Sequence, residues 1–307
     1  MRPALGKRLV PVLLAAAASV ALSALQAAAP AFGQYVAPQE PAAGPSPQKW
    51  AELEAAIQRG LRDFQGEIGF VIKDLSSGRT LVHDPDRRFA SASMVKIPIM
   101  AACYKAAEEG RVSLQDVLRV GRRDKVRGSG VLRASPTGTP VTVDKLLDLM
   151  ITDSDNTAAN MLIDLLGFEY LENAFRGFGL EATNLARKMM DFQARARGVE
   201  NYTTPREMAD ILERIYRRTC VSPQASEACL DLLKRQKVNN RIPRYLPRKV
   251  VVAHKTGLEN KVCHDAGIVY TGKGDVLISA FTEGDTGAII AERMIARVAS
   301  FVYRAYK

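Results

Sequence analysis

The sequence predicts an α+β fold in which an antiparallel five-stranded sheet is flanked by helices and an all-helical lobe is inserted between the strands. Strand patterns occur early in the chain, at 68–75 and 80–83, and late, at 250–253, 267–270 and 276–281. The stretch from Met94 to about Leu233 is dominated by helical patterns instead. Strands interrupted by a long helical segment favour a sheet with a separate helical layer. The cleft between such layers is a favoured ligand site.

The individual elements follow from local periodicity. A first amphipathic helix is predicted where apolar residues recur every three or four positions, at Trp50, Leu53, Ile57 and Leu61. Ser77-Gly78 is a hairpin signal between the first two strands. The clearest helical segments of the lobe are 143–151, 157–166 and 206–216, and a last amphipathic helix runs through Ile290, Met294, Val298, Phe301 and Val302.

Residues 1–31 are predicted to be a secretory signal peptide, because Arg2, Lys7 and Arg8 precede an apolar run at 9–25 and then a cluster of small residues. A membrane anchor is the alternative, but a span needs roughly 20 apolar residues. Residues 32–48, rich in Pro and Ala, predict a flexible tether, and 49–307 predict one folded domain. We therefore expect an exported, periplasmic or extracellular monomer without stable membrane insertion after cleavage.

The formal net charge is +10, and removal of Arg2, Lys7 and Arg8 leaves +7. Lys and Arg are scattered among Asp and Glu, which does not favour a nucleic-acid partner. The excess is interpreted as an aid to solubility, with attraction to anionic cell-surface polymers as an alternative.

Four cysteines, Cys103, Cys220, Cys229 and Cys263, would meet an oxidising compartment after export. Cys220 and Cys229 flank a short segment and could form a bridge, whereas Cys103 lies in an apolar helical run and is predicted to be a buried thiol. No Cys-x-x-Cys pair occurs, and the chain has only three histidines. We therefore expect neither a metal nor another cofactor.

Ser93-Met94-Val95-Lys96 follows the second strand and opens a helical segment, which places Ser93 and Lys96 on one helix face. A serine hydroxyl becomes a good nucleophile when a neighbouring group takes its proton, and a lysine with a lowered pKa can do this. Ser46-Pro47-Gln48-Lys49 has the same spacing but lies in the predicted tether, where nothing would hold it in register. Pro98 predicts distorted first turns after Ser93.

Two further motifs suit the same chemistry. Ser154-Asp155-Asn156 joins two helical segments, where it could be an ordinary helix cap or present Ser154 as a proton relay. Lys255-Thr256-Gly257 ends the predicted strand at 250–253, and Gly257 permits a ligand to approach the strand edge. Its alternative interpretation is a charged strand end before a turn.

Together, the three motifs resemble those of the class A β-lactamase and penicillin-binding serine hydrolase family, Ser-x-x-Lys, Ser-Asp-Asn and Lys-Thr-Gly. Their separations here are 61 and 101 residues, and the resemblance covers residues 49–307. It implies a β-lactamase/transpeptidase-like fold and a small-molecule β-lactam or cell-wall peptide substrate.

The resemblance also implies residue roles. Ser93 would be the acylated nucleophile, Lys96 its base and Ser154 the proton shuttle beside Lys255. Asn156 would position Lys96 and the substrate amide, Thr256 would bind the substrate carboxylate, and the backbone N–H groups of Ser93 and Leu258 would form the oxyanion hole. Arg241 is a candidate second anion contact, with surface solubility as the alternative.

The sequence departs from this family in the loop at 187–204. Class A β-lactamases carry there a Glu that activates the deacylating water, but counting from Ser154 puts Met189 or Met190 at its place. Asp191 is the candidate substitute base, and an ion pair with Arg187 is its alternative role. Three functions stay open: a β-lactamase using Asp191 or another base, a cell-wall peptidase or related hydrolase, and an acylated sensor or binding module with little turnover.

Overall fold

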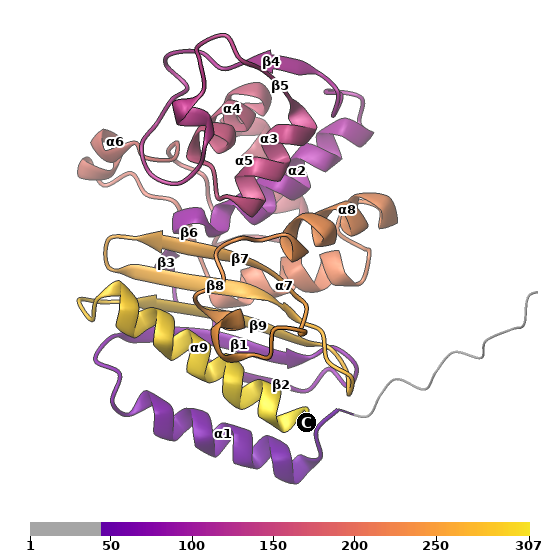
Figure 1. The fold of residues 1–307 in the computed structure, drawn as a ribbon, viewed down its shortest axis with the longest axis vertical. Coiled ribbons are helices and arrows are strands. Elements are labelled where there is room, and N and C mark those ends of the chain that lie inside the picture. The colour runs from indigo at the N-terminus through magenta and orange to yellow at the C-terminus, as the bar shows by residue number, and fades with distance from the viewer. Residues whose placement is uncertain (1–43) are drawn as a thin grey trace, which may run out of the picture. The chain divides into compact units, whose positions relative to one another are not determined.

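A five-stranded antiparallel sheet lies at the centre of the fold, with the strand order β2-β1-β9-β8-β7 (Figure 1). The structure, a computed structural model, describes residues 44–307, so the predicted signal peptide and most of the predicted tether lie outside the described residues. The strands are β1 (Glu67–Asp74), β2 (Thr80–His83), β7 (Val252–Glu259), β8 (Val262–Val269) and β9 (Val276–Glu283). Because β1 pairs with β9 along its whole length, the early and late strands form one sheet, as predicted.

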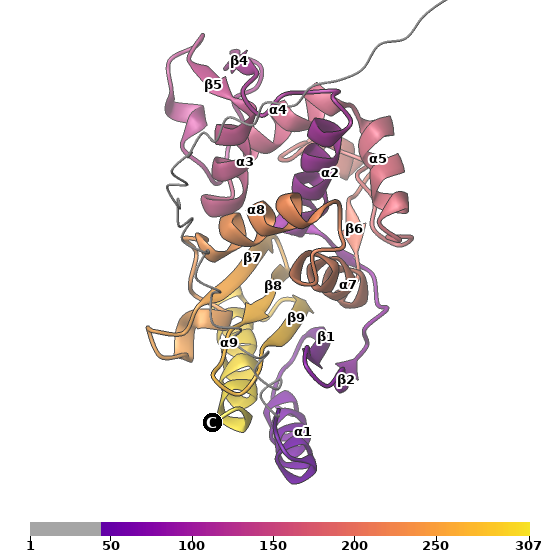
Figure 2. The same cartoon turned by 90° about the vertical axis from the view of Figure 1, so that its right-hand side faces the viewer.

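Two terminal helices, α1 (Pro47–Leu61) and α9 (Ala288–Ala305), cover one face of this sheet (Figures 1 and 2). The periodic residues Trp50, Leu53 and Ile57 are buried there, as their spacing predicts. Ser46 is the N-cap of α1 and accepts a hydrogen bond from the Lys49 amide at 3.3 Å. The prediction of a tether up to residue 48 was therefore wrong at its end, and Ser46 and Lys49 are held in register by a helix start.

The opposite face carries the helical lobe. Helices α7 (Pro205–Tyr216) and α8 (Pro223–Lys234) pack directly on the sheet, and beyond them lie α2 (Lys96–Glu108), α3 (Val143–Thr152), α4 (Asn156–Leu166) and α5 (Phe168–Gly177) (Figure 2). The lobe is not entirely helical, because β4 (Val117–Arg119) pairs with β5 (Pro140–Thr142). A second short pair joins β3 (Phe89–Ala90) to β6 (Tyr202–Thr203). The short helices are η1 (Ala92–Val95), η2 (Leu132–Ala134), α6 (Phe192–Ala196) and η3 (Ile242–Tyr245).

All four cysteines are free thiols in this structure, and Cys103 is buried as predicted. The bridge considered between Cys220 and Cys229 is not formed. Within residues 44–307, no helix combines the length and the apolar character that crossing a bilayer requires.

Candidate active site

Ser93 lies in the 3-10 turn η1, which enters α2, and it is half-buried at the wall of a cavity of about 190 Å³. The preceding residue, Ala92, has a φ of 45°, a left-handed conformation that costs a non-glycine residue about 1–3 kcal/mol. A 3-10 turn in place of regular helix agrees with the distortion predicted from Pro98. The strained turn presents the Ser93 side chain to the cavity.

Lys96 is fully buried and reaches from the start of α2 to the second motif. Its Nζ donates hydrogen bonds to the Ser154 carbonyl oxygen at 2.7 Å, to Asn156 Oδ1 at 2.7 Å and to Ser154 Oγ at 3.3 Å. Burial lowers the pKa of Lys96 to about 7, while the nearby Asp155 carboxylate acts in the opposite direction. A large fraction of this lysine is therefore a neutral amine near neutral pH and can accept a proton.

Lys255 approaches the same hydroxyl from the sheet. Its Nζ donates to Ser154 Oγ at 2.9 Å and to the Thr256 carbonyl oxygen at 2.7 Å. Its pKa lies well below the usual value, first because the side chain is buried and second because Lys96 and Arg241 are nearby cations. Ser154 thus stands between two lysines, and its φ of 54° is the second left-handed non-glycine conformation at this site.

Lys96 Nζ bonds to the second motif, and within residues 44–307 it makes no hydrogen bond to Ser93 Oγ. A long distance between nucleophile and base is common in sites without substrate. The structure therefore joins Lys96, Ser154 and Lys255 in one hydrogen-bonded cluster, and Asn156 links this cluster to the cavity that Ser93 lines.

The third motif lies inside strand β7 rather than at its end. The predicted strand, 250–253, was too short because β8 pairs with β7 through Glu259, including Lys255 with Ala266 and Gly257 with His264. A Cβ at Gly257 would come within 3.1 Å of Met94, so glycine allows β7 to pack against η1. As the last strand of the sheet, β7 leaves one edge free for an extended substrate, and Leu258 lines the cavity together with Ser93.

The loop at 187–204 places Met189 and Met190 in the cavity wall. Asn160, on α4, holds the backbone of Met189 at both sides: its Oδ1 accepts from the Met189 amide at 2.8 Å, and its Nδ2 donates to the Met189 carbonyl at 3.1 Å. Met190 has a φ of 66°. The same loop also contributes Arg187, Phe192, Glu200 and Asn201 to the cavity wall, and the Glu200 carboxylate is paired with Arg187 and Arg195.

The Asp191 side chain bonds to the backbone of its own loop. Its carboxylate accepts a hydrogen bond from the Ala194 amide at 2.9 Å and so caps α6. It does not belong to the residues that line the cavity around Ser93. The alternative role considered from the sequence, an ion pair with Arg187, was wrong.

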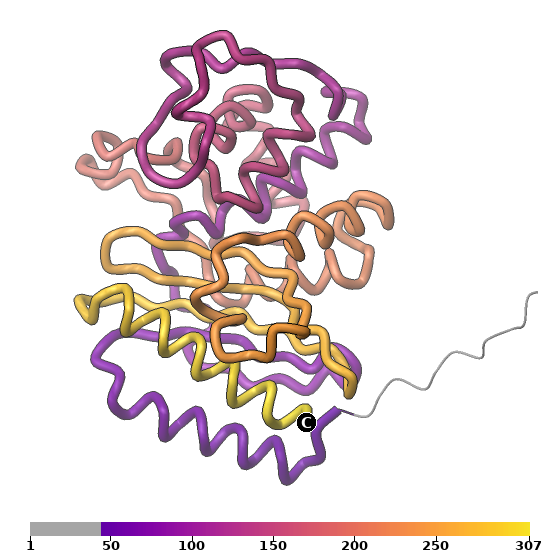
Figure 3. Tube along the Cα trace, in the orientation of Figure 1, coloured from indigo at the N-terminus to yellow at the C-terminus, as the bar shows by residue number. Residues whose placement is uncertain are grey.

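Arg187 joins the loop to the sheet through other carboxylates. Its guanidinium lies 2.7 Å from Glu200 and 3.1 Å from Glu259, and Arg195 lies 3.0 Å from Glu259 (the loop is the salmon segment beside the β7–β8 turn in Figure 3). In this cluster Glu200 binds both arginines within the loop, and Glu259 binds the same two arginines from β7. The cluster fixes one wall of the cavity against the other.

The sequence analysis missed Asn160 and Glu259, although each had a signal. Asn160 follows Asn156 by four residues and therefore shares its helix face. Glu259 follows Lys255 by four residues along β7, so the two side chains project from the same face of the sheet.

Arg241 is buried, so the prediction of a solubilising surface role was wrong. Its Nε donates to Cys263 Sγ at 3.1 Å, and its guanidinium lies 3.6 Å from Glu292. After burial and the Lys96 charge, its positive charge is the third cause of the lowered pKa of Lys255. Arg241 does not line the cavity around Ser93, and its guanidinium is held by Asn240 and Glu292.

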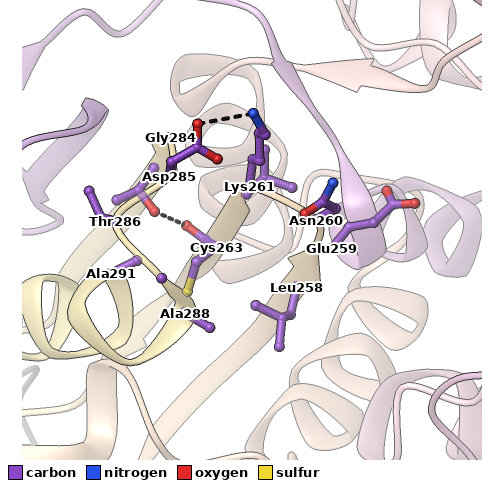
Figure 4. Close-up of a pocket in the computed structure, with 13 residues that line it drawn as sticks. Leu258, Glu259, Asn260, Lys261, Cys263, Gly284, Asp285, Thr286, Ala288 and Ala291 are labelled. Atoms are coloured by element: carbon purple, nitrogen blue, oxygen red, sulfur yellow. Dashed lines mark hydrogen bonds and ion pairs between the residues drawn. The ribbon is translucent and has the colours of Figure 1, made fainter.

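A second cavity, of about 390 Å³, lies between the β7–β8 turn and the start of α9 (Figure 4). Leu258, Cys263, Ala288 and Ala291 supply apolar lining. Its rim is closed by the ion pair of Lys261 with Asp285 at 3.0 Å and by the hydrogen bond that Thr282 Oγ1 donates to the Cys263 carbonyl at 2.8 Å. Leu258 and Glu259, at the end of β7, line both cavities.

Comparison with known proteins agrees with this geometry. The chain is 24% identical to the β-lactamase VEB-1 of Pseudomonas aeruginosa, over 83% of this chain and 90% of that protein, and 30% identical to a β-lactamase of Streptomyces fradiae, over 81% and 85%. A β-lactamase structure from Sphaerobacter thermophilus is 33% identical with a TM-score of 0.78, covering 84% of this chain and 97% of that one.

Two structures of PBP-A, one of them a variant captured as an acyl-enzyme with penicillin G, are 31% and 30% identical with TM-scores of 0.77, covering 83% of this chain and 96% of those. The model of the Beta-lactamase enzyme family matches residues 52–306. Since this match spans nearly all of the described fold, including Ser93, Ser154 and Lys255, the chain belongs to the Beta-lactamase enzyme family.

Proposed function

We propose that the protein is a serine hydrolase of the β-lactamase type, in which Ser93 attacks the carbonyl group of a β-lactam or a related amide and forms an acyl-enzyme. The observation that carries this proposal is that Lys96 and Lys255 both donate hydrogen bonds to Ser154 Oγ. Lys96 also donates to Asn156, which lines the same cavity as Ser93. The β-lactamases among its relatives support the same substrate class.

In the proposed acylation step, neutral Lys96 takes the proton of the Ser93 hydroxyl as its oxygen bonds to the carbonyl carbon. Ser154 then passes a proton to the leaving nitrogen, drawing on the two lysines that contact it. The backbone N–H groups of Ser93 and Leu258 stabilise the oxyanion. Asn156 binds the substrate amide, and Thr256, at the free edge of β7, binds the substrate carboxylate.

The hydrolysis of the acyl-enzyme is proposed to be slow. Met189 and Met190 stand at the loop positions where class A β-lactamases are expected to carry a Glu, and a thioether is not a useful base at neutral pH. The two carboxylates that line the same cavity, Glu200 and Glu259, are ion-paired with Arg187 and Arg195. A cell-wall peptidase or a sensor with little turnover is therefore the second candidate. The similarity to PBP-A, whose variant is known as an acyl-enzyme with penicillin G, favours this candidate.

Intact-mass analysis after rapid mixing with benzylpenicillin tests the proposal. We expect an adduct of one penicillin per chain that forms quickly and decays slowly. A short-lived adduct with accumulating product would identify an efficient β-lactamase, and a permanent adduct would identify a peptidase or sensor. The absence of any adduct, with any penicillin, would contradict the proposed function.

The rate constant of acylation is expected to depend on pH through Lys96. Because its pKa is about 7 and only the neutral amine accepts a proton, the rate should rise with pH below about 7 and become constant above it. Stopped-flow measurements from pH 5 to 9 would show this profile. A rate that is the same at pH 5 and pH 9 would assign the base to another group.

We further propose that residues 1–31 direct export to the periplasm or the medium and are then removed. The order of basic, apolar and small residues supports this step. N-terminal sequencing of the protein recovered from its native host should find a start near Ala31. A retained Met1 would refute the cleavage.

A further inference from the structure

Half of the net positive charge lies in one loop. Residues 119–133, termed the basic loop below, contain a single acid, Asp124, and six cations, Arg119, Arg122, Arg123, Lys125, Arg127 and Arg133. Its net charge is +5, against +10 for the whole chain. The prediction that Lys and Arg are scattered among acids was therefore wrong for this segment.

The cations of the basic loop are not neutralised by the protein. In the described part of the chain none of the six forms an ion pair, whereas Arg187, Arg206 and Arg235 elsewhere each do. Arg119 and Lys125 donate only to backbone carbonyl groups, of Gly138 and Ser135. The carboxylate of Asp124 is occupied by the Gly121 amide at 2.6 Å. An uncompensated positive field of this kind attracts anions.

The basic loop is fixed by four hydrogen bonds to the second catalytic motif and by one to the adjacent Thr157. Asp155 Oδ2 accepts from the amides of Val131 and Leu132, and Thr157 Oγ1 accepts from the amide of Val126. The backbone N–H of Asn156 donates to the Ser129 carbonyl, and its side-chain Nδ2 donates to the Arg127 carbonyl. The loop therefore holds a defined position relative to Asn156.

Two glycines make this contact possible. Gly128 and Gly130 have φ values of 92° and 111°, and a Cβ at these positions would come within 2.6 Å of Asn156 Nδ2 and 2.2 Å of Asp155 Cγ. The close approach brings Gly128 and Ser129 into the wall of the cavity that Ser93 lines.

Three of the cations line a hollow of their own. Lys125, Arg127 and Arg133 surround an open space of about 390 Å³, and Gly128, next to Arg127 in the chain, lines the cavity around Ser93. Arg127 and Arg133 are exposed, and the Arg127 backbone contacts Asn156 directly. Groups attached to a substrate beyond an amide held by Asn156 would consequently reach these side chains.

We propose that the basic loop binds an anionic group on the acyl side of the substrate, so that the enzyme prefers acyl donors with a carboxylate several bonds beyond the amide at Asn156. This inference rests on the proposed function. An acidic substrate fits better than a separate anionic polymer because the loop is anchored to Asn156 and shares the wall of the reacting cavity. Arg127 and Arg133 are the specificity-determining residues.

The test compares two penicillins that differ only in charge: 6-aminopenicillanic acid acylated with adipic acid, and the same compound with its terminal carboxylate converted to a primary amide. The second-order rate constant for acylation of Ser93 should be about 3- to 10-fold higher for the carboxylate, because exposed charge pairs contribute modestly each. The ratio should fall towards one in Arg127→Gln/Arg133→Gln and, through screening, at about 0.5 M salt.

Arg293→Gln/Arg297→Gln is the matched control, since both residues are exposed, without an ion pair in the described chain, on α9 at the opposite face of the sheet. It should keep the preference.

Equal rates for both penicillins in the unmodified enzyme, or an equal loss for both in the loop variant, would overturn the inference while leaving the proposed function intact. Acylation by neither compound would remove the proposed function and the inference with it. Binding to immobilised polyphosphate is measured with the same proteins. If Arg127→Gln/Arg133→Gln loses this binding but keeps the preference for the carboxylate penicillin, the basic loop binds a phosphate polymer and the inference is overturned.

Discussion

Replacement of Ser93 by Ala is expected to abolish covalent labelling by penicillins and fluorophosphonates, with a loss of more than about 10⁴-fold, because the nucleophilic oxygen is removed. Ser93 is half-buried within the turn η1, so its truncation should leave the fold and the thermal transition unchanged. Intact-mass analysis and circular dichroism would measure the two properties.

The chain contains a matched control for this experiment in Ser46, which has the same spacing to a lysine. Ser46→Ala removes the N-cap of α1 and should reduce stability by about 1 kcal/mol without changing the labelling. Labelling that persists in the Ser93 variant, or that disappears in the Ser46 variant, would transfer the nucleophile to another residue.

Introduction of a carboxylate by Met189→Glu is expected to accelerate hydrolysis of the acyl-enzyme by roughly 10²- to 10⁴-fold, the usual contribution of a positioned general base. The two hydrogen bonds from Asn160 fix the Met189 backbone, so the new side chain should enter the cavity from the same point. The lifetime of the adduct in time-resolved mass spectrometry reports the effect.

Met189→Gln has nearly the same shape as the Glu variant but no base, and it should leave the lifetime long. Asp191→Asn tests the base considered from the sequence. Because Asn is as good an N-cap as Asp, the cap of α6 should survive and the lifetime should stay unchanged. A clearly longer lifetime in this variant, without slower acylation, would instead make Asp191 the base.

The order of strands and helices could be predicted because each element has a strong local pattern. Trp50, Leu53 and Ile57 repeat at helical spacing, and Ser77-Gly78 marks the first hairpin. The length of β7 could not be predicted, since the polar residues Lys255 and Thr256 interrupt its apolar pattern. Pairing with β8, which is a long-range interaction, extends the strand through them.

The candidate site around Ser93 could likewise be predicted from the sequence only in part. The motifs indicate which side chains carry the reaction, but they do not indicate the contacts that hold them. The cluster of Arg187, Arg195, Glu200 and Glu259 joins segments up to 72 residues apart, and no local signal pairs these charges. The uneven distribution of basic residues was visible in the sequence, whereas their position beside Asn156 depends on the fold.

The burial of Lys96 also has a consequence for the folding equilibrium. In the unfolded chain this lysine regains its ordinary pKa of 10.5, so between about pH 7 and pH 10 the unfolded state binds the proton that the folded state has released. The free energy of unfolding therefore contains a term that grows as the pH rises through this interval, on the order of a few kcal/mol. At neutral pH the burial of Lys96 thus lowers the free energy of unfolding, and packing in the rest of the core has to offset this loss. Urea unfolding of the wild type and of Lys96→Met should reveal it as a stability difference that shifts in favour of the wild type as the pH is raised.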